Sequence, residues 1–99
     1  MKIHDIKTPA LILDYDKFNS NIQKIMGMIE VNPIELRPHF KTHKSTAISK
    51  KLINAGAKGI CCAKLGEAQV LADAGIKDIL IANQITQLSK VDCVAELAR

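Results

Sequence analysis

Apolar and polar positions alternate along this chain in blocks that predict short strands followed by helices. The first block predicts a strand at residues 10–13 and then a helix with Asp14 as its N-cap. Apolar residues recur every three or four positions along that helix: Phe18, Ile22, Ile25, Met26 and Ile29. Pro33 cannot continue a helix, so we expect the helix to end before it.

The rest of the chain repeats the strand-then-helix order. Alternation with period 2 predicts a strand at residues 36–42, and continuous apolar runs predict strands at residues 58–63 and 78–82. Ser45 is placed to cap the helix after the first of these, residues 66–74 form the next helix, and Thr86 is placed to cap the last.

Two helix exits repeat each other. The segments AGAKGI and AGIKDI carry Gly56 and Gly75, 19 residues apart, at positions where glycine permits a left-handed exit. Repeated βα units with continuous apolar strands predict parallel pairing and right-handed crossovers. We therefore expect an α/β fold with about three barrel strands and flanking helices, as part of a (β/α)8 barrel, or else a small open sheet.

Size, composition and charge exclude several classes of protein. The 99 residues suffice for one small domain, and 3% aromatic content favours an Ala/Ile/Leu-packed α/β core over a β-sandwich. The net charge of +4 comes from scattered lysines without interleaved aromatic residues, which argues against a nucleic-acid partner. No apolar run is long enough for a membrane span. Three unevenly spaced cysteines are expected to be reduced thiols of a cytoplasmic protein.

The segment RPHFKTHK carries the candidate chemistry. If it is a strand, Arg37, His39, Lys41 and His43 point to one face, and apolar residues point to the other. Lys41 would lie at the carboxyl end of its strand, where barrels place catalytic groups. Neighbouring cations and partial burial would disfavour the protonated amine, so Lys41 would be suited to form a Schiff base. The same cations would attract an anionic cofactor such as pyridoxal phosphate (PLP).

Other interpretations of these residues stay open. A run of basic residues is commonly a solvated edge. His39 and His43 could bind a metal together on a helix, but in an extended chain they lie ~13 Å apart, so we expect no metal ligand here. Glu67 is better explained as a helix cap than as a ligand. The same uncertainty applies to Asn83 and Gln84, which are either turn residues or ligands.

The segments TPALILD, RPHFKTHK, CAKLGEA and DILIANQ together resemble the D-threonine aldolase and D-serine dehydratase family. Its members are PLP enzymes with an alanine-racemase-like barrel. The resemblance implies that Lys41 binds PLP as a Schiff base and then moves a proton. From the shared face we infer that Arg37, His39 and His43 tune Lys41 or contact cofactor oxygens.

The resemblance also implies what lies beyond these residues. Residues 1–99 would be the N-terminal part of the PLP-binding barrel domain, truncated, because family members are much longer. They carry a divalent-metal site in a later domain, act on small D-amino acids, and are expected to be cytoplasmic homodimers. Retro-aldol cleavage of D-threonine-like substrates to glycine and an aldehyde is the leading hypothesis. Dehydration of D-serine, PLP binding without catalysis, and an inactive structural fragment are the alternatives.

Overall fold

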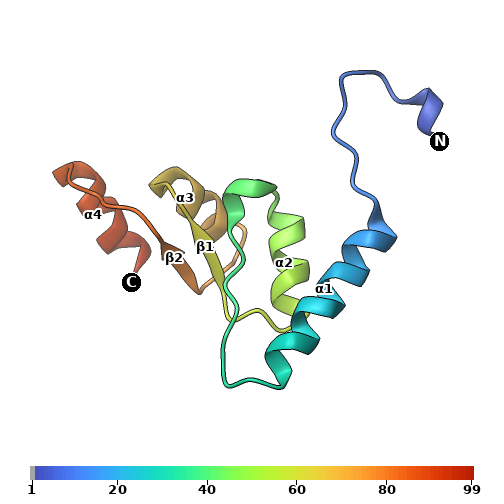
Figure 1. Ribbon diagram of the computed structural model, residues 1–99. Helices are drawn as coiled ribbons and strands as arrows, with labels where there is room; N and C mark the ends of the chain where they lie inside the picture. Colours follow the sequence, from blue (N-terminus) through green and yellow to red (C-terminus); the bar gives the residue numbers. More distant parts are fainter. Residues whose placement is uncertain (1) are drawn as a thin grey trace.

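The computed structural model describes residues 2–99 and shows the predicted alternation of helices and extended segments (Figure 1). The elements, with η for a 3-10 helix, are η1 (Ile3–Asp5), α1 (Tyr15–Glu30), η2 (Phe40–Thr42), α2 (Thr46–Asn54), β1 (Ile60–Cys62), α3 (Leu65–Asp73), β2 (Ile79–Ile81) and α4 (Leu88–Leu97). Within the described residues, no helix combines the length and apolar character needed to cross a membrane. The three cysteines are free thiols.

Three rows of backbone run parallel, with β1 in the middle. On one side β1 pairs with β2, and Cys61 lies opposite Leu80. On its other side residues 36–39 run parallel to it and form a bridge between His39 and Cys61. The N–H groups of Lys58 and Cys61 donate to carbonyls of that segment at 2.9 Å. The parallel β/α repeat is therefore confirmed, although its first strand forms only in part.

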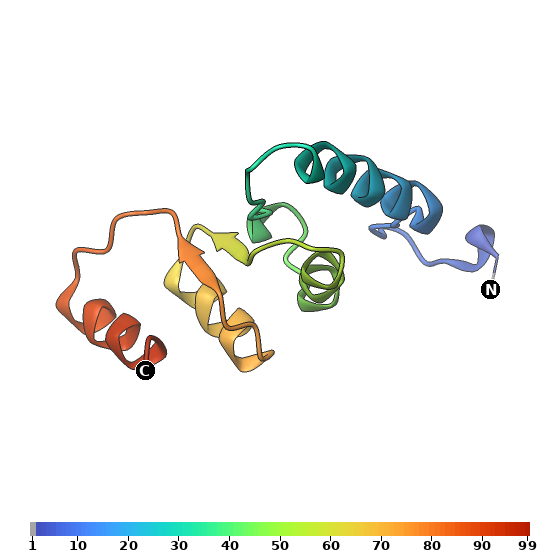
Figure 2. The ribbon, with the colours of Figure 1, turned by 90° about the horizontal axis from the view of Figure 1, so that it is seen from below.

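The crossover helices begin and end where local chemistry predicts. The Ser45 hydroxyl accepts a hydrogen bond from the Ile48 N–H at 3.3 Å and so caps α2. Gly56 and Gly75 end α2 and α3 with φ angles of 117° and 84°, which residues with a Cβ rarely adopt. Figure 2 shows α3 and α4 next to each other on one side of the strands, and residues of the two helices are in contact.

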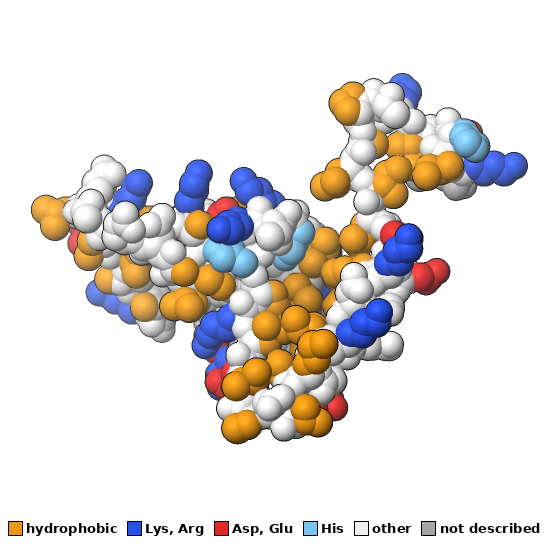
Figure 3. Space-filling view, viewed as in Figure 1, with side chains coloured by type: hydrophobic (Ala, Val, Ile, Leu, Met, Phe, Trp, Pro, Cys, Tyr) orange, Lys and Arg blue, Asp and Glu red, His pale blue; other side chains and the backbone are white. Residues whose placement is uncertain are grey.

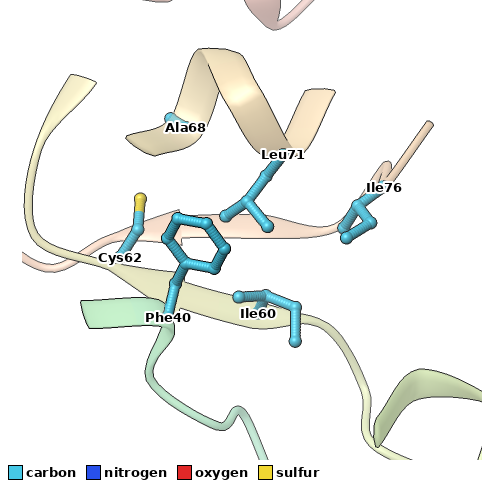
Figure 4. Packing of buried hydrophobic residues seen from close by; sticks show 6 residues of the cluster. All are labelled: Phe40, Ile60, Cys62, Ala68, Leu71 and Ile76. Atoms are coloured by element: carbon cyan, nitrogen blue, oxygen red, sulfur yellow. The ribbon is translucent and has the colours of Figure 1, made fainter. Parts of the chain in front are cut away.

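The buried side chains form two clusters. The first joins the strands to α3 and contains Phe40, Ile60, Cys62, Ala68, Leu71 and Ile76. Figure 4 shows Phe40 and Ile60 pointing from the strand side toward Leu71 on α3. The second cluster lies between α1 and α2 and contains Ile22, Met26, Leu52 and Ala57. The first cluster is the one that carries η2 and therefore the candidate site.

Two predictions about local structure outside the candidate site are wrong. Residues 10–13 form no strand, and Leu11 there is 98% exposed, because no described segment lies alongside to pair with them. Thr86 is not the cap of α4, whose N-cap is Gln87 without a side-chain hydrogen bond. An apolar period fixes a helix start only to within one or two residues.

The molecule has the shape of an open arc. Its radius of gyration is 16.0 Å, whereas a compact chain of about 100 residues has about 13 Å. The segment before α1 extends away from the body (Figure 1). Leu80 in β2 is 49% exposed, so the strands are covered by helices mainly on one face.

Candidate active site at the carboxyl ends of the strands

Lys41 lies in a 3-10 turn and not in a strand. The extended segment stops at His39, whose Nδ1 accepts a hydrogen bond from the Lys41 N–H at 3.2 Å. The Thr42 hydroxyl donates to the His39 carbonyl at 3.0 Å. Side chains that bond to nearby backbone offer the chain an alternative to a ladder of strand hydrogen bonds. The predicted strand over residues 36–42 is therefore wrong beyond residue 39.

The predicted row of four basic side chains does not form. Arg37 forms an ion pair with Asp78, and its Nη2 donates to Asp78 Oδ2 at 3.0 Å. The hydrogen bond from Arg37 lowers the pKa of Asp78, and the carboxylate raises the pKa of Arg37. Asp78 precedes β2, so this pair lies at the amino ends of the strands, whereas Lys41 lies at the carboxyl ends.

Lys41 itself is exposed. The burial that we expected around its amine is not provided by residues 2–99. What the structure does provide is a fixed backbone, because η2 is held by the His39 and Thr42 hydrogen bonds and by the buried Phe40, which is 3% exposed. The amine is thus accessible to a ligand at the rim.

His43 is partly buried behind η2. Its ring packs edge-on against Phe40 with centroids 5.6 Å apart, and its Nδ1 accepts a hydrogen bond from the Ser45 N–H at 3.1 Å. Burial is the main cause that lowers the pKa of His43. Its Nε2 is buried and has no partner among residues 2–99. A buried nitrogen without a partner is a place where a polar atom of a ligand, or of another part of a protein, fits.

Two further polar side chains hold the segments that follow β1 and β2. Glu67 accepts hydrogen bonds from the N–H groups of Ala63 at 2.8 Å and Lys64 at 3.3 Å, and the Ala63 bond is the main cause that lowers its pKa. Asn83 donates to the Ala63 carbonyl at 3.1 Å and accepts from the Gln84 N–H at 3.0 Å. Glu67 is therefore a helix cap, and Asn83 is a turn residue that links the two strand ends.

A cleft that the sequence reasoning missed lies beside these strand ends. Its volume is about 910 Å³, and its lining includes Lys44, Lys64 and Lys90 together with Glu67. Lys and Arg side chains gather along the upper edge of Figure 3, where the strands end in Figure 1. Each lysine lies just before a helix or in its first turn, and no local pattern indicates that these three segments meet. Within residues 2–99, no cluster of three or more His, Cys, Asp or Glu side chains is suited to a metal ion.

A parallel β/α arc is the arrangement found in part of a (β/α)8 barrel, and the comparisons with known proteins agree with this fold. Residues 13–98 match the family model described as alanine racemase, N-terminal domain. The chain belongs to this family. The predicted α/β partial barrel of the alanine racemase N-terminal type is thereby confirmed.

Similar proteins fall within one group of enzymes. D-threonine aldolase of Arthrobacter sp is 37% identical over 95% of this chain and 25% of its own length. 3-hydroxy-D-aspartate aldolase of Paracoccus denitrificans is 38% identical over 96% of this chain and 25% of its own. D-threo-3-hydroxyaspartate dehydratase of Delftia sp. (strain HT23) is 38% identical over 78% of this chain and 20% of its own. This chain thus spans about a quarter of the length of these relatives or less.

Solved structures give the same result. The crystal structure of D-threonine aldolase from Filomicrobium marinum superposes with a TM-score of 0.94 and 43% identity, over 97% of this chain and 26% of that one. D-threo-3-hydroxyaspartate dehydratase from Delftia sp. HT23 superposes with a TM-score of 0.84 and 33% identity, over 93% of this chain and 24% of that one. The resemblance to the aldolase and dehydratase family is confirmed. The roles of Arg37, His39, Lys41 and His43 stay predictions.

Proposed function

We propose that this chain is the lysine-bearing segment of a PLP-dependent lyase that acts on β-hydroxy D-amino acids. The observation that carries the proposal is the position of Lys41, an exposed amine on a fixed turn at the carboxyl end of a barrel strand. Residues 1–99 would then be the N-terminal part of the barrel domain. The similarity to two aldolases and a dehydratase supports this class of reaction.

The described residues fit PLP at its aldehyde end. Lys41 offers an accessible primary amine for a Schiff base, and the buried Nε2 of His43 has no hydrogen-bond partner within residues 2–99. His39 receives its hydrogen bond at Nδ1, which leaves the ring hydrogen on Nε2 in the neutral tautomer. PLP, when bound, supplies an electron sink for carbanion chemistry. Lys41 and His39 are the groups of this chain suited to move or hold a proton there.

Arg37 has a different role in this proposal. Its pairing with Asp78 joins the first extended segment to β2 at the end away from Lys41. We therefore assign Arg37 to positioning the strands and not to contact with the cofactor. His43 keeps the predicted place beside the cofactor through its unpaired nitrogen.

Retro-aldol cleavage to glycine and an aldehyde is the reaction that we propose first. Two of the three relatives named above are aldolases, and so is the solved structure with the TM-score of 0.94. Dehydration is the second candidate, supported by the similarity to the dehydratase. Two of these relatives act, by their names, on 3-hydroxyaspartate, a dicarboxylic substrate, and so such substrates belong to the proposed class beside D-threonine. Binding of PLP without catalysis is the alternative in which Lys41 keeps its role.

The remaining parts of the proposal concern the whole protein. A divalent metal would polarise the β-hydroxyl group of the substrate, with ligands that are not among the residues described. The whole protein would be a cytoplasmic homodimer with a small D-amino acid as its partner. Each of these statements follows from the family and is tested on the complete protein.

Trapping of PLP tests the proposal on this chain. After incubation with saturating PLP and reduction with borohydride, peptide mass mapping is expected to locate the adduct on Lys41. The adduct should be lost in Lys41→Ala and kept in Lys50→Ala, which removes another exposed lysine, located on α2. Equal labelling of many lysines, or none at Lys41, would refute the proposed role. Release of glycine from D-threonine, or of ammonia from D-serine, then separates aldolase, dehydratase and binding protein.

A further inference from the structure

The cleft beside the strand ends carries positive charge that the local structure does not use. Lys44, Lys64 and Lys90 line it, and none of the three forms a salt bridge within residues 2–99. The carboxylate on its wall, Glu67, is already occupied by the two N–H groups that it caps. The lining thus has three lysine ammonium groups and one carboxylate, which already accepts two hydrogen bonds, so the cleft should attract anions.

The cleft begins at Lys44, three residues after Lys41 in the sequence. Lys44 comes two residues after η2, and its N–H donates to the Phe40 carbonyl at 2.8 Å. Its φ of 47° is a left-handed conformation that residues with a Cβ adopt at a cost. Lys44 and His39 both contribute to lowering the pKa of Glu67, so all three side chains are close enough to interact. Lys41 and the cleft thus share one short segment of chain.

We propose that this cleft binds an oxyanion of a small molecule through Lys44, Lys64 and Lys90. Ammonium groups form charge-assisted hydrogen bonds with carboxylate and phosphate oxygens. Thr86 and Gln87, which also line the cleft, add polar groups that can orient such a ligand. The oxyanion is the second carboxylate of a dicarboxylic substrate or the phosphate group of a cofactor. The choice of these two ligands as sources of the oxyanion rests on the proposed function.

Titration of the 15N-labelled chain with small anions tests the site. The probes are D-malate, which has two carboxylates, D-lactate, which is a hydroxy acid with one, and inorganic phosphate. We expect saturable shifts of backbone amides around Lys64, Thr86 and Lys90. Each of Lys44→Met, Lys64→Met and Lys90→Met should weaken binding about 3- to 10-fold, because one of three ion pairs is lost. Lys24→Met on α1 removes the same charge far from the cleft along the chain and should leave binding unchanged.

The results of the titration distinguish a substrate carboxylate from a cofactor phosphate, and both from the absence of an anion site. Tighter binding of D-malate than of D-lactate and phosphate assigns the cleft to a substrate carboxylate, and tighter binding of phosphate assigns it to a phosphate group. No saturable binding, or equal weakening by Lys24→Met, overturns the inference. The borohydride adduct on Lys41 is an independent readout. Loss of that adduct with intact anion binding would reject the proposed function and leave the anion site standing.

Discussion

Phe40 is expected to be the side chain that holds Lys41 in place. It begins η2, is 3% exposed, and points into the cluster between the strands and α3 (Figure 4). Its backbone carbonyl also accepts hydrogen bonds from His43 at 3.3 Å and Lys44 at 2.8 Å. Shortening this side chain should therefore loosen the turn that carries the amine as well as the core beneath it.

The magnitude follows from the area that Phe40 buries. A phenylalanine side chain buries roughly 150–250 Å², which at about 25 cal/mol per Å² is about 4–6 kcal/mol. Measured Phe→Ala changes in cores cost about 3–5 kcal/mol. Domains of this size have a free energy of unfolding of about 5–15 kcal/mol, and an open arc belongs at the low end. Phe40→Ala would then unfold much of the population, so Phe40→Leu, at roughly 2 kcal/mol, is the informative variant.

Urea unfolding followed by circular dichroism measures this loss, and Phe18→Leu is the matched control. Phe18 lies half-buried on α1 against the second cluster, so the same change should cost less there, about 1 kcal/mol. Without urea, trapping of PLP on Lys41 should fall in Phe40→Leu and stay unchanged in Phe18→Leu. Equal losses of stability in both variants, or unchanged trapping in Phe40→Leu, would refute the role that we give to Phe40.

Three further predictions use the same unfolding assay. Gly59→Ala should lower the free energy of unfolding by at least about 1–3 kcal/mol, because the added Cβ would collide with Asp78 and the Arg37 guanidinium. Gly27→Ala on α1 adds a Cβ where no atom lies within 4 Å, and should raise the free energy of unfolding by about 0.5–1 kcal/mol. Since burial lowers the pKa of His43, the contribution of His43 to the free energy of unfolding should be constant above pH about 6.5 and decline as the pH falls below it. His43→Asn keeps an acceptor for the adjacent N–H and should flatten that decline; an unchanged profile would contradict this reasoning. Ser45→Ala removes the cap of α2 and should cost about 1 kcal/mol, with no change expected in Ser45→Asp.

Helices and buried strands were predictable here because their signals are local and periodic. Capping residues predict Asp14 as the N-cap of α1, and glycines predict the helix exits at Gly56 and Gly75. The apolar runs predict the parallel rows around β1. Residues 10–13 fail for the opposite reason. Their apolar run is compatible with a strand, but a strand forms only beside a partner, and no local pattern shows which segment that partner would be.

The candidate site was predictable only in part. Period 2 placed Phe40 on the apolar face, and Phe40 is buried, yet the same period carried the strand through Lys41 because it ignores the hydrogen bonds between the backbone and the side chains of His39 and Thr42. The pairing of Arg37 with Asp78 joins positions 41 residues apart, and an ion pair at that separation leaves no trace in a local pattern. The basic cleft is likewise assembled from three separate segments.

These observations divide the construction of the site into two parts with different origins. The position of Lys41 comes from within a few residues of it, through the His39 and Thr42 hydrogen bonds and the burial of Phe40. Its chemical environment does not, since its side chain is exposed and the Nε2 of His43 lacks a partner within residues 2–99. A Schiff-base lysine needs an unprotonated fraction, and desolvation and neighbouring charge are what provide it. The local turn thus fixes the backbone from which the amine extends, whereas the reactivity that we propose for it would depend on groups that are distant in the sequence or belong to a ligand.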